Sequence, residues 1–405
     1  MRIAIIGVFL VSVLFRLFLN YLTYTRMNAP VPNNVKDVFD NEKYEKEQRY
    51  KREYLRFNIV DELIGVVFVL ALLLLNLHFG LYEWINRFTD NIYLTSLFIM
   101  GIPIVAAMIL DTIVGIYGTF VIEERYGFNK TTPATYFFDF LKSFAISAVL
   151  MGGLFSLFLL LYNTIGEWVF IAFFFIMMIF QVFMLFISPL MIRVFYKLTP
   201  LEDGSLKDKI QAMAVQTGYK FKAIYKVDAS KRSTKLNAFA AGFGKTKTIG
   251  LFDTMLDKMT EDEILFVLGH EIGHAKKGHI LKSAPLSLLV FGIMLAAAYF
   301  VVAMPEVSQA FGFAGANLAF GIYVVAILLE PVMQVLQIPS NTLSRKHEYE
   351  ADKFGKDLTS PAAGVAALKT LYRESLGNLT PHPFVVMMEY SHPPLTDRVS
   401  AIERK

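Results

Sequence analysis

The hydrophobic positions of this chain gather into seven long stretches, and the segments between them hold most of the charged residues. A helix that crosses a bilayer needs about 20 apolar residues. The pattern therefore predicts seven membrane-spanning helices, near residues 3–23, 59–79, 93–120, 143–162, 167–190, 283–304 and 317–338.

The first stretch has the length of a signal peptide but lacks its cleavage site. Its apolar core continues past Arg16 into Leu17-Phe18-Leu19, with no small-residue site after it. We therefore expect an uncleaved span. Arg16 then reaches the membrane interface or faces a polar interior.

The segment between the fifth and sixth stretches has a different pattern, which indicates a folded insert outside the membrane. An amphipathic helix is expected from Glu202 to Gly218. Short runs of alternating or β-branched residues then predict three strands. The strands are expected at Lys222–Val227, Lys235–Phe243 and Thr246–Phe252.

These patterns divide the chain into four expected parts. Five spans and the polar loops 24–57 and 121–142 belong to an N-terminal membrane region. The fold class is a membrane all-α protein with a small α+β insert. The parts are residues 1–199, the insert 200–282, spans six and seven in 283–338, and a C-terminal region 339–405.

Composition supports a membrane protein and removes several kinds of chemistry. Hydrophobic residues make up 55% of the chain and charged residues 18%, whereas soluble domains carry about 25% charged residues. The chain has no cysteine, which excludes disulfides, a thiolate nucleophile and cysteine metal ligands. A net charge of +4 gives no reason to expect nucleic acid as a partner, so the lipid bilayer is the expected surrounding.

Lysine and arginine are distributed unevenly among the segments outside the spans. Four segments contain 36 of the 39 basic residues: 24–57, 121–142, 191–282 and 339–405. Basic loops stay on the cytoplasmic side. We therefore expect the N-terminus outside and the C-terminus in the cytoplasm. The membrane would be the plasma membrane in a prokaryote and the endoplasmic reticulum in a eukaryote.

The insert ends with the motif His270-Glu271-Ile272-Gly273-His274. In a helix, positions i and i+4 share one face, so both histidines can bind one metal ion. A catalytic zinc site takes about three protein ligands and leaves a position open for water, and Glu271 can take a proton from that water. The alternative is a solvated helix with two chance histidines. The chain has only seven histidines, and Thr260 and Glu263 form a helix-start signal before the motif.

A third ligand is expected after the seventh span, in the run from Ser344 to Asp352. Glu348 and Asp352 share a helix face, whereas Glu350 points elsewhere. A charged, solvated helix is the alternative for the whole run. From the residues alone, four side chains remain open as the third ligand: His347, Glu348, Glu350 and Asp352.

Further motifs follow in a fixed order along nearly the whole chain: residues 117–132, 198–204, 230–234, 237–239, 251–254, 344–352 and 391–398. With the two-histidine motif, this series resembles the zinc-dependent, seven-span CAAX prenyl proteases of the gluzincin group. One departure is Lys235, where that family has a histidine. The resemblance implies a large water-filled chamber between the spans.

The resemblance also implies roles for individual residues. One zinc ion per chain would be bound by His270, His274 and Glu348. Glu271 would be the general base and later the proton donor to the leaving amine. Asp352 would orient a ligand imidazole.

Three further residues receive roles only through the resemblance. Asn237 would lie on an edge strand that holds the peptide substrate by main-chain pairing. His392 would stabilise the oxyanion or contact the substrate. Arg398 would neutralise a substrate carboxylate or a local acidic group. For His279, which follows Lys276-Lys277-Gly278, we expect no part in the chemistry.

The expected function is that of a membrane zinc metalloendopeptidase, with a peptide or protein as its substrate. The resemblance implies that it removes the last three residues of prenylated CAAX proteins. One alternative is a protease of broad specificity that clears damaged membrane proteins. Another is a chamber or channel protein with structural zinc. Glu271 argues against the latter, because a structural site closes with a fourth ligand and needs no base.

Overall fold

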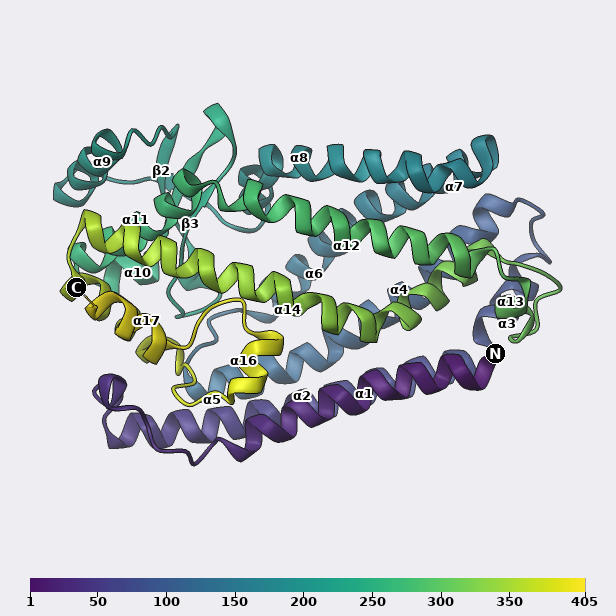
Figure 1. Ribbon diagram of the computed structural model, residues 1–405, viewed down its shortest axis with the longest axis horizontal. Helices are drawn as coiled ribbons and strands as arrows, with labels where there is room; N and C mark the ends of the chain where they lie inside the picture. The colour runs from purple at the N-terminus through teal and green to yellow at the C-terminus, as the bar shows by residue number, and fades with distance from the viewer. Residues whose placement is uncertain (405) are drawn as a thin grey trace.

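The computed structural model describes residues 1–404, apart from the side chain of Lys245. Long helices run along the longest axis of the molecule, and a small sheet lies at the end that also holds the C-terminus (Figure 1). The two termini lie at opposite ends of this axis, as an odd number of crossings requires. The expected fold class, helical with a small mixed insert, is confirmed.

Within residues 1–404, six helical segments are long and apolar enough to cross a membrane. The longest, Pro133–Phe195, reverses at Gly166–Trp168, where Gly166 adopts a φ of 59°. The end of the first half packs against the start of the second, and the two halves form separate crossings (Figure 1). The seven predicted stretches therefore correspond to α1 (Arg2–Thr25), α2 (Asn41–Leu74), α4 (Ile92–Tyr117), α6 (Pro133–Ser147) with α7 (Gly153–Ile165), α8 (Val169–Phe195), α12 (His279–Val302) and α14 (Leu318–Leu358).

Two of these helices extend far beyond their apolar parts. Helix α2 begins at Asn41, inside the charged segment that was predicted to be a partly helical loop, and Asp40 caps it by accepting from the backbone N–H of Lys43. Helix α14 continues from its apolar part to Leu358 and carries the candidate third ligand. Two helices therefore connect the membrane region directly with the insert.

The sheet has four strands in the order β1-β2-β4-β3. Strands β2 and β4 are parallel, and the two outer strands are antiparallel to their neighbours. Strand β1 was not predicted, because three residues ending in Pro200 show no alternation. The three predicted strands all form, and β3 lies at an edge of the sheet. The four strands are β1 (Leu198–Pro200), β2 (Ala223–Val227), β3 (Ala238–Ala241) and β4 (Thr248–Phe252).

The largest hydrophobic core surrounds helix α11 (Glu261–Lys277) of the insert and also includes buried residues from the N-terminal and C-terminal regions. Ile249 and Leu251 of β4 are fully buried against it, as are Phe266 and Leu268 of the helix itself. The other helices around this core are α9 (Ser205–Thr217), α10 (Asp253–Lys258), α15 (Pro361–Ser375) and α17 (Leu395–Glu403). The remaining short helices are α3 (Leu77–Ile85), α5 (Glu124–Tyr126), α13 (Pro305–Gln309) and α16 (Pro383–Glu389).

Three ionisable side chains meet between the apolar parts of α1, α2 and α14. The Arg16 Nε donates to Glu62 Oε1 at 2.8 Å, and a second guanidinium nitrogen pairs with Glu330. Each side chain is 18–30% exposed. Ionisable groups within a span seldom face lipid. The group therefore indicates a polar interior that water can reach. Of the two positions expected for Arg16, the membrane interface and a polar interior, the structure favours the second.

Candidate metal centre

Helix α11 begins with the predicted capping box. The Thr260 hydroxyl accepts from the backbone N–H of Glu263, and the Glu263 carboxylate accepts from the backbone N–H of Thr260 at 2.8 Å. The helix ends at Gly278, which adopts a φ of 67°. Between these ends, its residues from Glu263 to Gly273 are almost all buried. Packing around this stretch therefore fixes the helix backbone and the buried His270, whereas the His274 side chain is 27% exposed.

Glycines let α11 and α14 approach each other closely. A Cβ atom on Gly269 would lie 3.0 Å from the Cα of Gly355, and one on Gly355 would lie 2.9 Å from the carbonyl oxygen of Phe266. Neither position has room for a side chain, because the obstructing atoms belong to the backbone. The close crossing brings residues separated by more than 70 positions into one site.

Three side chains of these two helices converge on one point. His270 Nε2 lies 3.0 Å from His274 Nε2, and Glu348 oxygens lie 3.5 Å and 3.2 Å from these two nitrogens. Zinc bonds of about 2.0–2.1 Å in a tetrahedral site keep ligand atoms about 3.3 Å apart. Glu348 Oε2 is also buried with no hydrogen-bond partner in the described chain. The three residues therefore fit a zinc ion, as predicted for them.

Asp352 lies behind the first histidine, one turn of α14 after Glu348. Its Oδ1 is 2.9 Å from His270 Nδ1, so the carboxylate holds the ring with Nε2 directed to the ligand cluster. Arg398 of α17 donates to both carboxylate oxygens, from Nε at 2.8 Å and from Nη2 at 2.6 Å. The three buried side chains form one continuous network.

This network bears on the expectation that Arg398 neutralises a substrate carboxylate. The guanidinium is buried and is bound in bidentate form by Asp352, and its Nη2 lies 3.6 Å from Glu348. A buried pair of this kind does not offer its charge to an incoming peptide. The structure favours the other alternative, in which Arg398 neutralises a local acidic group.

The second histidine has a support that the sequence did not reveal. His279 Nδ1 lies 2.8 Å from His274 Nδ1, and His279 Nε2 lies 3.2 Å from Glu350. When His279 Nε2–H donates a hydrogen bond to Glu350, the unprotonated His279 Nδ1 can accept a hydrogen bond from His274 Nδ1–H. This arrangement leaves His274 Nε2 free to bind a metal. The sequence-based expectation that His279 takes no part in the chemistry did not foresee these contacts.

Glu271 lies between the ligand cluster and the edge strand β3. Burial raises the pKa of Glu271, and the charges of His270 and His274 and the backbone N–H of Ala240 act in the opposite direction. A carboxyl group with a raised pKa exchanges a proton more readily near neutral pH. The contact with Ala240 places this group beside the unpaired edge of the sheet.

The last two predicted residues lie at the rim of the site. The imidazole of His392 is exposed, and its Nε2 lies 3.5 Å from Glu348 Oε1. Asn237 is exposed directly before β3. Its Oδ1 accepts from the backbone N–H of Ala238 at 2.9 Å. Lys235, where the resemblance fails, forms an ion pair with Glu123 at 3.1 Å instead.

Comparison with protein families gives matches over both halves of the chain. The family described as CAAX prenyl protease N-terminal, five membrane helices, matches residues 20–197. Peptidase family M48 matches residues 200–405. The division between the two falls at the start of the insert.

Several relatives are similar over nearly their full length. CAAX prenyl protease 1 of Saccharomyces cerevisiae is 28% identical over 99% of this chain and 95% of its own. The probable CAAX prenyl protease 1 of Schizosaccharomyces pombe is 30% identical over 90% and 80%. Among solved structures, S. mikatae Ste24p matches with a TM-score of 0.93 at 26% identity, covering 100% of this chain and 99% of the other.

Proposed function

Because the chain belongs to peptidase family M48 and carries the N-terminal region of the CAAX prenyl proteases, we propose that it removes the last three residues of prenylated CAAX proteins. The chain is a multi-pass membrane metalloprotease. The substrate named here is the one in the names of its relatives.

One arrangement carries this proposal: three convergent ligand atoms, an adjacent carboxyl group and an unpaired strand edge. Zinc, one ion per chain, would supply the positive charge that makes a nearby water acidic. Glu271 takes the proton of the attacking water and returns it to the leaving amine. The neighbouring carboxylate Asp352 and the His279–Glu350 pair keep both ligand imidazoles in the required tautomer.

Substrate binding follows from the position of β3. Its free edge lies next to α11, and an extended peptide can add to it by main-chain hydrogen bonds. A peptide on this edge passes Ala240 and therefore passes Glu271. We assign Asn237 to the start of this strand contact and His392 to the oxyanion, because its ring lies within 3.5 Å of Glu348.

The alternative as a structural zinc protein has less support. Among the described residues, the ligand group contains three side chains and not four. An acid–base residue adjoins it. For orientation, we propose the N-terminus outside and the insert in the cytoplasm, which rests on the distribution of the basic residues.

The test is cleavage of a farnesylated CAAX peptide by the purified protein, measured beside an unmodified peptide of the same sequence. We expect cleavage of the farnesylated peptide, and loss of that cleavage with a chelator. Glu271→Gln should lower the rate by about 10²–10⁴-fold while zinc content stays near that of the wild type.

Each contrary result selects another function. Equal cleavage of both peptides would favour a protease of broad specificity. An intact zinc site with no cleavage of either peptide would favour the structural role. A Glu271→Gln variant with the wild-type rate would exclude this residue as the base.

A further inference from the structure

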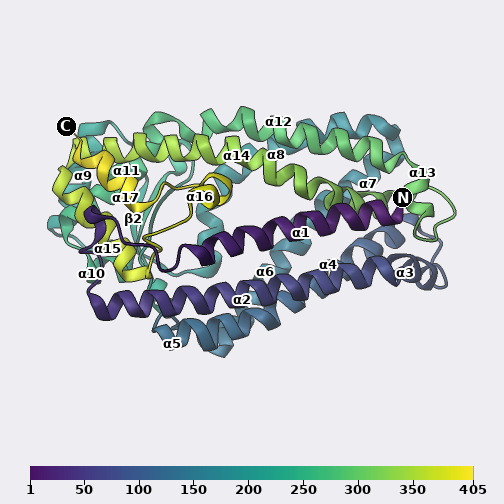
Figure 2. The same cartoon turned by 60° about the horizontal axis from the view of Figure 1, so that its bottom comes forward.

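Four arginines surround a groove at the end of α2 that emerges from its apolar part. Arg49, Arg52 and Arg56 lie on α2, and Arg125 lies on α5, which continues the α4 helix. The groove has a volume of about 850 Å³. Helices α2 and α4 run side by side at one edge of the molecule (Figure 2). No role in peptide cleavage has been given to any of these residues.

The arginines continue the outer face of α2. Spacings of three and four residues connect Arg52 and Arg56 with Val60, Leu63 and Val67, so all five share one side of the helix. The three apolar side chains are 46–67% exposed. An apolar stripe of this exposure on a span faces lipid chains. The arginines therefore stand at the level of the lipid headgroups, directly beyond the lipid-facing stripe.

Part of the positive charge in the groove is unbalanced. Among the described residues that line it, Glu53 alone is acidic, and it pairs with Arg125 and accepts from the Tyr126 hydroxyl. Arg52 Nη2 donates to the neutral side chain of Asn28 at 2.8 Å. In the described part of the chain, the Arg56 guanidinium has no ion-pair or hydrogen-bond partner. The groove therefore presents charge to a ligand from outside.

A smaller groove adjoins the first on the other side of the same arginines. Its volume is about 310 Å³, and Arg52 and Arg56 line it together with Leu17, Tyr21 and Ile59 of the neighbouring helices. Apolar side chains from both grooves thus lie next to the same pair of guanidinium groups. This shape matches a molecule with one anionic head and two apolar chains.

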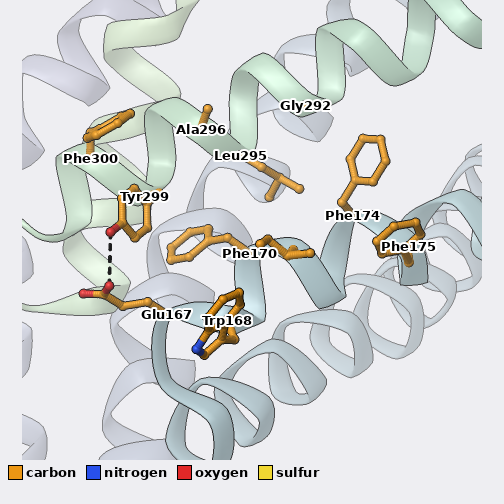
Figure 3. Close-up of a pocket in the computed structure, with 11 residues that line it drawn as sticks. Glu167, Trp168, Phe170, Phe174, Phe175, Gly292, Leu295, Ala296, Tyr299 and Phe300 are labelled. Atoms are coloured by element: carbon orange, nitrogen blue, oxygen red, sulfur yellow. Dashed lines mark hydrogen bonds between the residues drawn. The ribbon is translucent and has the colours of Figure 1, made fainter.

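A groove elsewhere in the protein shows the contrast. It lies between α8 and α12, has a volume of about 710 Å³, and is lined mainly by aromatic side chains such as Phe170 and Phe174 (Figure 3). Glu167 is its only charged lining residue, and that carboxylate accepts from the Tyr299 hydroxyl at 3.1 Å. Lipid chains can fill this groove, but it offers no cation for a phosphate.

We propose that the arginine groove is a binding site for an anionic phospholipid. Arg52 and Arg56 contact the phosphate and the anionic head, because guanidinium groups bind phosphate oxygens in bidentate form. One acyl chain lies along Val60 and Ile64, and the other lies beside Ile59 and Leu17. Basic pockets between helices at the cytoplasmic face bind anionic lipids in this way. The site is independent of the proposed peptidase reaction.

The test is a lipid titration of the full-length protein in detergent, followed by native mass spectrometry. Phosphatidylglycerol and phosphatidylcholine with identical chains are compared. We expect the wild type to bind phosphatidylglycerol at least about 10-fold more tightly. Arg52→Gln with Arg56→Gln should weaken that binding by about 25-fold, since each basic residue near a membrane surface contributes about 5-fold. Phosphatidylcholine carries the same phosphate but also a choline cation that the arginines repel, so its binding should weaken less than that of phosphatidylglycerol.

The matched control is Lys220→Gln with Lys226→Gln, which removes the same charge from exposed positions on the insert. We expect its affinity for phosphatidylglycerol to equal that of the wild type. An equal loss in the control would overturn the proposal, as would equal binding of the two lipids. Displacement of the lipid by 10 mM inorganic phosphate would indicate a site for small anions and also overturn it. Should the double variant not fold, Arg56→Gln alone must weaken binding by about 5-fold.

Discussion

Helix α8 belongs to the wall formed by the membrane-spanning helices and is apolar along most of its length, whereas α11 has charged residues at both ends and lies in the core around the metal ligands. Of the 27 residues in α8, only Val169 and Phe170 are buried, whereas 10 of the 17 residues in α11 are buried. A membrane-spanning helix can stay exposed within the protein because lipid covers one of its sides, and the neighbouring helices contact only a small part of the others. The metal ligands need the opposite surroundings, since their positions must be fixed by contacts on every side.

The charges of the two regions differ in the same way. Arg16 and its partners in the wall are 18–30% exposed, so water hydrates them. Asp352 and Arg398 beside the ligands are buried and bind each other in bidentate form. Removing one partner of an ion pair is therefore expected to change stability little in the wall and to lower it strongly beside the metal ligands. This contrast can be tested with substitutions of equal chemistry in both regions.

The largest effect is expected from loss of the third ligand. Glu348→Ala should lower zinc content well below one ion per chain and reduce peptide cleavage to background, because it leaves two protein ligands. Glu330→Ala is the matched change in the wall, on the same helix. It should retain the wild-type zinc content, measured by atomic emission on both purified variants. Equal zinc loss in the two would remove the distinction between core and wall.

Next in size is the effect of closing the contact between the ligand helices. Gly355→Ala places a Cβ atom 2.9 Å from the carbonyl oxygen of Phe266. Overpacking of this kind costs about 1–3 kcal/mol, and it should lower both the unfolding midpoint and the zinc affinity. In the wall, a Cβ on Gly292 would lie 3.6 Å from Phe174, which is ordinary contact. The free energy of unfolding of Gly292→Ala should therefore lie within about 0.5 kcal/mol of that of the wild type.

A smaller effect is expected behind the second ligand. His279→Phe removes the acceptor for His274 Nδ1 and should weaken zinc binding by about 10–100-fold, measured by competition with a metal buffer. Glu350→Gln should weaken it less, because an amide oxygen can still accept from His279. His347→Phe is the control, since that ring stacks on His279 at 4.1 Å without contacting a ligand. An equal loss in the control would mean that packing alone supports the site.

The smallest effect is expected from the charged group in the wall. Arg16→Gln leaves Glu62 and Glu330 without their cation, but both remain partly hydrated. Partly exposed ion pairs contribute about 0–1 kcal/mol. We expect the free energy of unfolding to fall by an amount within that range and the zinc content to stay unchanged. A fall of several kcal/mol in the free energy of unfolding, reversed by adding Glu62→Gln, would show that this part of the wall is packed as tightly as the core.

The sequence predicted the elements whose signal is local. All seven crossings follow from the length of the apolar stretches, and α11 follows from its capping box. Helix was expected in the polar segments beside the second and seventh spans, but its unbroken continuation from the spans as α2 and α14 was not, because the apolar pattern ends where the membrane ends although the helix continues. Strand β1 was too short to show a period.

Within the site, the sequence alone predicted only the residues whose relation follows from their spacing along one helix. His270 and His274 follow from positions i and i+4. Glu348 could not be selected from its neighbours without the family resemblance, because the crossing of α11 and α14 decides which carboxylate faces the histidines. His279 was missed for a similar reason, since the turn at Gly278 folds the start of α12 back toward His274.

The unbroken course of α14 sets a height above the bilayer. Its apolar part is expected to end near Ile338, and Glu348 follows ten residues later, which corresponds to about 15 Å along a helix. The headgroup layer on one side of a bilayer is roughly 5–8 Å thick. A peptide bond must therefore rise above the headgroups to be cut. When that bond adjoins a lipid-bearing residue, the residue must be partly drawn out of the hydrocarbon, whereas a longer tether would reach the same height freely.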